Sequence, residues 1–180
     1  MLISFEEGVQ RYGSKYNLKK MLAQKELYRL EKGIYSEKKY VPEHQIISKK
    51  YPTAIFTLNS AFYYHRFTDV IPEKYFLATN RGASKIADTR VIQIFENSDM
   101  LELGAEHIEY GGVCIYMYNK ERMLIELLRK KHKFPFDYYK EILNNYRKNI
   151  ESLDIIQIQD MAMKLPKSNM IMKAIQMEVI

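Results

Sequence analysis

The sequence has little of several residue types that mark particular classes of protein. It contains one cysteine, Cys114, and no tryptophan. A single cysteine excludes an intrachain disulfide, and it is typical of proteins in a reducing compartment. Cys114 stands in the apolar run 113–118, with no histidine at an interpretable spacing. This context predicts a buried, inert thiol and not a nucleophile.

Long hydrophobic runs are missing too. No apolar segment approaches the roughly 18 residues that a membrane-spanning helix needs. The N-terminus reads MLISFEE, which is acidic where a secretory signal peptide would be basic. These features predict a soluble protein that stays in the cytoplasm.

Sequence motifs for metals and phosphates are also absent. The four histidines show no metal-binding spacing, and neither HExxH nor CxxC occurs. There is no Walker loop and no GxGxxG pattern. We therefore expect no metal and no cofactor, and we assign no catalytic residue.

The residues that are present predict a folded, locally basic protein. Hydrophobic residues make up 47% of the 180 residues, with 15 tyrosines and 8 phenylalanines, which argues against disorder. The formal net charge is +6. Between Arg11 and Lys32 seven basic residues stand against two acids, so most of the excess charge lies in one short segment. Such a segment attracts phosphate backbones.

Residues 1–38 have the pattern of a winged helix-turn-helix domain. Apolar residues at helical spacing predict a first helix over residues 3–12. Ser14 is a suitable N-cap for a second helix over residues 15–24. A hairpin is expected over residues 26–36, because Gly33 can take the positive φ that closes a tight turn. This order of elements is that of a helix-turn-helix followed by a wing.

In that domain the second helix enters the major groove of double-stranded DNA, and the hairpin lies against phosphates. We expect base contacts from Asn17 and one or two lysines, and salt-dependent affinity from the other cations. An ordinary amphipathic helix and hairpin with solvated lysines would show the same periodicity. The expected DNA-binding residues are Lys15, Tyr16, Asn17, Lys19, Lys20, Arg29 and Lys32.

Residues 39–180 are predicted to form a second domain of mixed helices and strands that ends in a helical bundle. The chain as a whole is therefore assigned to the α+β class. A stripe of tyrosines and aliphatic residues over residues 135–150 is more typical of a packed core than of a platform for bases. Helices are expected at residues 42–50, 61–65, 119–131 and 135–150 and after Asp154 and Ser168, and strands at 74–79, 90–96, 106–110 and 113–118.

Three segments of this domain carry side chains that could bind a ligand. Residues 79–85 offer a glycine, hydroxyls and two cations, although a solvated loop is the commoner outcome of such a pattern. His65 beside Arg66 and Asp69 is more typical of a structural histidine than of a catalytic cluster. The basic run 129–133 opposes a helix dipole, and it could also contact nucleic acid or an acidic partner.

A set of short strings occurs in order along nearly the whole chain. The strings are YGS at 12–14, LEKGIY at 30–35, KYPTA at 50–54, SAFYYH at 60–65, TD at 68–69, IP at 71–72, NRG at 80–82, ERML at 121–124 and LR at 128–129. The set resembles the AbiEi-type antitoxin family of bacterial abortive-infection systems. Two features depart from that family. Arg66 stands where a glycine is common, and two helices precede the wing where fuller members have three.

The resemblance implies a transcriptional autoregulator that binds inverted repeats in operator DNA upstream of its own operon. It also implies an antitoxin against a nucleotidyltransferase-like toxin, with which no stable complex is expected, and it implies no catalytic activity. For the antitoxin function it points to a basic surface with Arg81, Arg122 and Arg129.

Two other functions stay open from the sequence. One is an enzyme of nucleic-acid or nucleotide metabolism that binds phosphate at the Arg81 loop, although no cluster of carboxylates for a metal is visible. The other is an interaction protein whose basic helix blocks an acidic partner. The oligomeric state is open as well.

Overall fold

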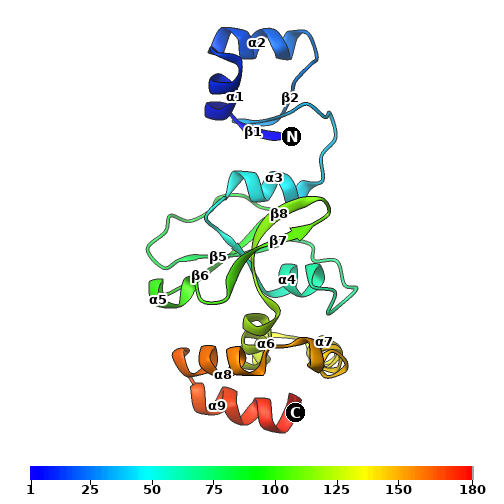
Figure 1. Cartoon of the computed structure of the whole chain (residues 1–180), viewed down its shortest axis with the longest axis vertical. Coiled ribbons are helices and arrows are strands. Elements are labelled where there is room, and N and C mark those ends of the chain that lie inside the picture. Colours follow the sequence, from blue (N-terminus) through cyan, green and yellow to red (C-terminus); the bar gives the residue numbers. More distant parts are fainter. Residues whose placement is uncertain (180) are drawn as a thin grey trace. The chain divides into compact units, whose positions relative to one another are not determined.

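The computed structural model describes residues 1–179, and the chain divides into two compact units (Figure 1). The first unit is Met1–Pro52, and the second begins at Thr53. Each unit combines helices with a sheet of its own, which confirms the α+β class. The boundary predicted after residue 38 falls inside the first unit, because the helix α3 (Glu43–Lys50) packs on two strands of that unit.

The first unit consists of a small antiparallel sheet and three helices. Strand β3 is central in the order β1-β3-β2. A core of Ile3, Leu18, Leu27 and Tyr35 joins the sheet to α2. In chain order the elements before α3 are β1 (Leu2–Ser4), α1 (Phe5–Tyr12), α2 (Lys15–Ala23), β2 (Tyr28–Glu31) and β3 (Ile34–Ser36).

The start of the chain differs from the prediction of a helix from residue 3. Ile3 is a buried strand residue that pairs with Tyr35. Helix α1 begins only after Ser4, whose hydroxyl accepts a hydrogen bond from the Glu7 N–H at 3.2 Å. The Glu7 carboxylate accepts the Ser4 N–H at 2.6 Å in return. This reciprocal capping box satisfies two N–H groups and fixes the helix start.

The second unit is built on a mixed sheet in the order β6-β5-β4-β8-β7. The pairs β5/β6 and β4/β8 are parallel, and the other neighbours are antiparallel. Gly111 and Gly112 both have positive φ and close the predicted hairpin of β7 and β8. The strands and the helices among them are β4 (Ile55–Phe56), α4 (Leu58–Tyr64), β5 (Tyr75–Asn80), β6 (Val91–Glu96), α5 (Ser98–Leu101), β7 (Ala105–Tyr110) and β8 (Val113–Tyr118).

Helices follow the sheet as predicted, and the long ones bury one face each. Leu124 and Leu127 of α6 are fully buried. Tyr146 of α7 is also buried, and its ring stacks on Phe67 with centroids 3.8 Å apart. The tyrosine stripe is therefore part of the core. The last helices are α6 (Lys120–Arg129), α7 (Phe136–Lys148), α8 (Ile155–Lys164) and α9 (Ser168–Ala174), with 3₁₀ turns at Lys131–Lys133 and Ile150–Ser152 and a π-helical turn at Ile175–Val179.

Cys114 is exposed, so the prediction of a buried thiol is wrong. Side chains alternate along β8, and Ile115 and Met117 occupy the buried face. Cys114 lies on the other face of the strand. An apolar run does not predict burial of every member here, because it supplies residues to both faces of the strand.

Arg66 adopts a conformation that glycine takes more readily. Its φ is +62°, and its N–H donates to the Tyr63 carbonyl at 2.9 Å directly after α4. The positive φ of Arg66 lets the chain turn sharply at this helix end.

Within the described part of the chain, no helix has the length and apolarity to cross a membrane.

Candidate nucleic-acid interface and a basic pocket

Helix α2 presents its polar face to solvent. An N-cap fixes where the helix begins, and one buried leucine fixes which face packs on the core. The Ser14 hydroxyl accepts the Asn17 N–H at 3.1 Å, which ties the helix start. Leu18 is 2% exposed and packs into the core of the first unit. Gly8 of α1 permits this contact, since a Cβ atom there would stand 3.0 Å from the Leu18 side chain.

All five residues predicted to face DNA from α2 are exposed. Tyr16 has 76% of its surface accessible. The Asn17 side-chain amide donates to the Tyr12 carbonyl at 2.9 Å, so its oxygen is the atom left to accept a hydrogen bond from a base. Within residues 1–179 the ammonium groups of the three lysines form no hydrogen bond or ion pair. The exposed set is Lys15, Tyr16, Asn17, Lys19 and Lys20.

The two cations predicted on the hairpin are exposed as well. Arg29 lies on β2, and its Nε donates to the Glu31 carbonyl at 3.4 Å. Lys32 lies at the tip beside Gly33, whose φ of +82° closes the turn. In the described part of the chain the Lys32 ammonium has no acidic partner.

Three other cations of the first unit are neutralised. Arg11 pairs with Glu37 at 2.7 Å, and Lys49 pairs with Glu7 at 2.6 Å. Lys50 pairs with Glu31 at 3.2 Å. The lysines of α2 differ from these three cations, because no acidic side chain of the described residues neutralises them.

The net charge of the chain is divided unequally between the two units. Residues 1–52 hold eleven lysines and arginines against six glutamates, a balance of +5 out of the total of +6. The larger unit is close to neutral. The excess positive charge is therefore concentrated in the first unit.

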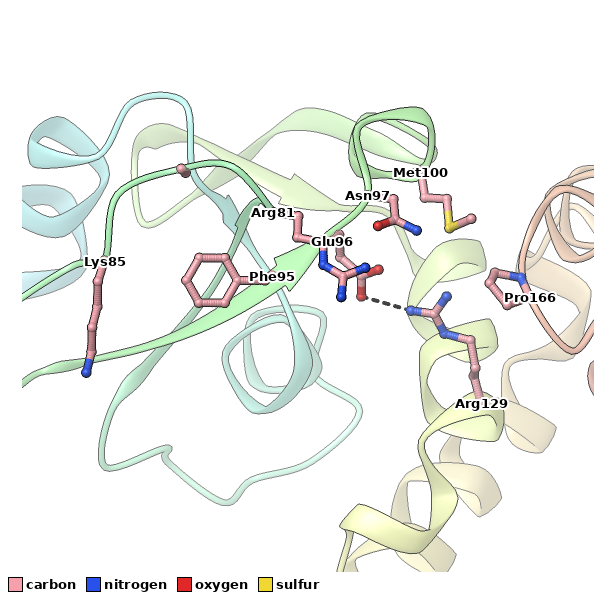
Figure 2. A pocket seen from close by; sticks show the side chains of 9 residues that line it. Arg81, Lys85, Phe95, Glu96, Asn97, Met100, Arg129 and Pro166 are labelled. Carbon is pink, nitrogen blue, oxygen red and sulfur yellow. Dashed lines mark hydrogen bonds and ion pairs between the residues drawn. The ribbon is translucent and has the colours of Figure 1, made fainter.

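The second unit contains an open pocket of about 630 Å³ beside the ends of β5 and β6 (Figure 2). Arg81 comes directly after β5, and Phe95 and Glu96 are the last residues of β6. The residues that line the pocket include Arg81, Lys85, Phe95, Glu96, Asn97 and Arg129. Two of the three arginines predicted for a basic surface, Arg81 and Arg129, are thus at one site.

Arg129 is tied into a buried network of ion pairs. Its Nη2 lies 2.8 Å from a Glu96 oxygen and 3.1 Å from a Glu126 oxygen. The Lys130 ammonium bridges the same two glutamates, at 2.9 and 2.8 Å. Arg129 therefore neutralises carboxylates, and the basic run at the end of α6 is largely paired within the fold.

Arg122 does not lie on the surface, so its assignment to a basic surface is corrected. It is fully buried, its Nε donates to Glu126 at 3.0 Å, and its Nη1 donates to the carbonyls of Met100 and Leu103. Its guanidinium also lies over the Tyr118 ring, 4.7 Å from the centroid. These contacts make Arg122 part of the core of the second unit.

The network shifts the titration of its members. Burial alone would raise the pKa of Glu126, but the nearby charges of Lys130, Arg122 and Arg129 lower that pKa below 4.5. Burial opposes the charged form of Arg129, and the carboxylates of Glu126 and Glu96 outweigh it and raise the pKa of Arg129. Both groups are charged at neutral pH.

His65 has a structural role, as its sequence context predicted. Its Nε2 lies 2.7 Å from the Tyr118 carbonyl, so this nitrogen carries the proton and donates. Burial lowers the pKa of His65, which keeps the ring neutral. No hydrogen bond or ion pair joins it to Asp69 within residues 1–179.

Across residues 1–179, no group of three or more histidine, cysteine or acidic side chains is placed to hold a metal ion.

No protein-family model matches the chain, and no characterised protein matches it either.

Phe95 and Glu96 were not singled out from the sequence. They end a short strand with no motif around them, and only the pairing of β5 with β6 places them beside Arg81. Glu126 had a visible signal, because it stands four residues after Arg122 and four before Lys130 on one helix.

Proposed function

We propose that the chain is a regulator that binds double-stranded operator DNA through a winged helix-turn-helix formed by α1, α2 and the β2–β3 hairpin. The observation that carries the proposal is the set of exposed, unpaired lysines on α2, in a unit whose other cations include several that are paired with acids. The hairpin follows α2 directly and carries two more exposed cations.

In this proposal α2 enters the major groove and the hairpin rests on the phosphate backbone. Asn17 reads a base through its side-chain oxygen, which accepts from the amino group of adenine or cytosine. Lys15, Lys19 and Lys20 supply charge close to the groove. Arg29 and Lys32 bind phosphates from the hairpin.

The resemblance to AbiEi-type antitoxins extends the proposal to a biological role. The chain would repress its own operon in the cytoplasm and counteract a nucleotidyltransferase-like toxin without forming a stable complex and without catalysis. Among the exposed cations of the second unit, we assign Arg81 to this role. Arg129 lines the same pocket.

The DNA-binding proposal is tested by an electrophoretic mobility shift of the full chain on its own upstream region, with scrambled competitor and a salt series. We expect a discrete shift that resists the competitor. In the Lys19→Ala/Lys20→Ala variant we expect weaker binding and a flatter salt dependence. Each phosphate contact contributes roughly 0.9 to the slope of log K against log salt, so the loss of both lysines lowers that slope by up to about 2.

The matched control is Lys140→Ala/Lys148→Ala, which removes the same charge from exposed positions on α7. It should leave the affinity and the slope unchanged. An unaltered slope in the α2 variant, or an equal loss in both variants, would contradict the assignment of α2 to the groove.

The antitoxin role predicts that expression of the chain restores the growth of cells that express the toxin encoded beside it. Arg81→Ala should reduce this rescue while leaving the DNA shift intact. Colony counts under separate induction of the two genes measure the effect. If the chain gives no rescue at equal expression, the antitoxin role is wrong and the DNA-binding proposal still stands on its own test.

A further inference from the structure

The pocket of the second unit lies where parallel strands commonly create ligand sites. Strands β5 and β6 run parallel in register from Tyr75/Val91 to Asn80/Glu96. Arg81 and Asn97 follow their carboxyl ends directly and both line the pocket. In open α/β sheets, ligands commonly bind in the crevice outside the carboxyl ends of parallel strands.

The cations at the mouth of this pocket are available to an anion. Arg81 and Lys85 are both exposed, and within residues 1–179 neither side chain has a hydrogen bond or ion pair. The one carboxylate among the lining residues is Glu96, and it is already bound by Arg129 and Lys130. Glu96 therefore does not neutralise Arg81 and Lys85, and the pocket retains a positive charge.

An exposed aromatic ring accompanies these cations. Phe95 has 46% of its surface accessible and lies on β6, an edge strand of the five-stranded sheet. Figure 2 shows its ring between the side chains of Lys85 and Arg81. An exposed phenyl ring next to two free cations can stack a planar base while the cations hold phosphate.

We propose that this pocket binds a mononucleotide, with the base on Phe95 and the phosphates on Arg81 and Lys85. A guanidinium and an ammonium provide several donors for phosphate oxygens, and Arg81 can bind two oxygens at once. The volume of about 630 Å³ is that of a small-molecule site, for which roughly 300–1,000 Å³ is typical. The site lies outside the winged helix-turn-helix and is independent of the DNA-binding proposal.

Isothermal titration calorimetry of the full chain with ATP, GTP, tripolyphosphate and adenosine tests the assignment at constant ionic strength. We expect saturable binding of at least one nucleoside triphosphate, weaker binding of tripolyphosphate and no measurable heat with adenosine. Arg81→Ala should weaken the binding of nucleotide and of tripolyphosphate alike. Phe95→Ala should weaken nucleotide binding by about tenfold and leave tripolyphosphate binding unchanged.

Two controls separate the pocket from general attraction to basic surfaces. Lys74→Ala removes an exposed cation just before β5, at the opposite end of that strand from Arg81. Lys19→Ala/Lys20→Ala removes charge from α2. Both variants should bind the nucleotide as the unaltered chain does, and circular dichroism of each variant should match that chain.

Three outcomes would overturn the proposal. The first is the absence of saturable nucleotide binding up to millimolar concentration. The second is a loss of nucleotide binding in the α2 variant as large as in Arg81→Ala. The third is equal binding of ATP and tripolyphosphate, both insensitive to Phe95→Ala, which would reduce the site to a phosphate site without a place for a base.

Discussion

At the scale of single residues, the second unit depends on a carboxylate that is almost removed from water. Glu126 is 1% exposed and has three cations within ion-pair distance, Arg122, Lys130 and Arg129. Glu96 shares two of these cations from β6. Loss of one partner from such a network leaves other charges buried without compensation, which costs far more than the loss of a surface ion pair.

We expect Glu126→Gln to lower the free energy of unfolding by about 3–5 kcal/mol near pH 7, because buried cations lose their partner. The pKa of Glu126 in the fold lies below its ordinary value of 4.5, so the stabilisation is present above that pH. It is lost as the pH falls through the folded pKa. Urea denaturation across a pH series should therefore show the gap between the two proteins narrowing below pH 4.5.

The control for this prediction is Glu141→Gln, an exposed position on α7. It should differ little from the unaltered chain at every pH. A gap for Glu126→Gln that does not narrow between pH 7 and about pH 3 would show that the carboxylate charge is not the source of the stabilisation.

At the scale of elements, the helices show what local pattern can predict. Helix α6 begins after Asn119, whose side chain accepts the Arg122 N–H, and α2 begins after Ser14 in the same way. Both caps and both apolar faces are visible in sequence. The candidate DNA-binding face of α2 was predictable for the same reason, because periodicity alone separates Leu18 from the lysines.

The elements that were missed depend on distant partners. Strand β1 has three residues and exists because Ile3 pairs with Tyr35, which no local pattern indicates. The family resemblance points to a basic surface for Arg122, but its side chain is buried by contacts with distant residues that the sequence does not reveal. The pocket could not be assembled from sequence, since Arg81 and Phe95 meet only through the register of two parallel strands.

At the scale of the whole molecule, each unit has a core of its own. Ile47 of α3 is fully buried in the first unit, and Ile125 of α6 is fully buried in the second. The first unit has only 52 residues, and small units bury a smaller share of their surface. We therefore expect the two units to unfold in separate steps, the first unit at the lower temperature.

Two matched substitutions test this expectation by differential scanning calorimetry. Ile47→Val and Ile125→Val each remove one buried methylene-sized group, at a cost of roughly 0.5–1.5 kcal/mol. Ile47→Val should lower only the first transition, by several degrees, and Ile125→Val only the second. Ile71→Val, at an exposed position, should move neither. One shared transition that both buried substitutions lower would show that the chain unfolds as a single cooperative body.

Because Cys114 is exposed, its thiol can be labelled with a fluorophore in the unaltered chain. Its thiol lies on β8 in the second unit, and the sequence contains no other cysteine. A maleimide fluorophore would therefore attach at one known place, and no residue would have to be replaced beforehand. A dye there, paired with one on the end of a DNA duplex, would follow complex formation by energy transfer while every lysine of α2 stays unmodified.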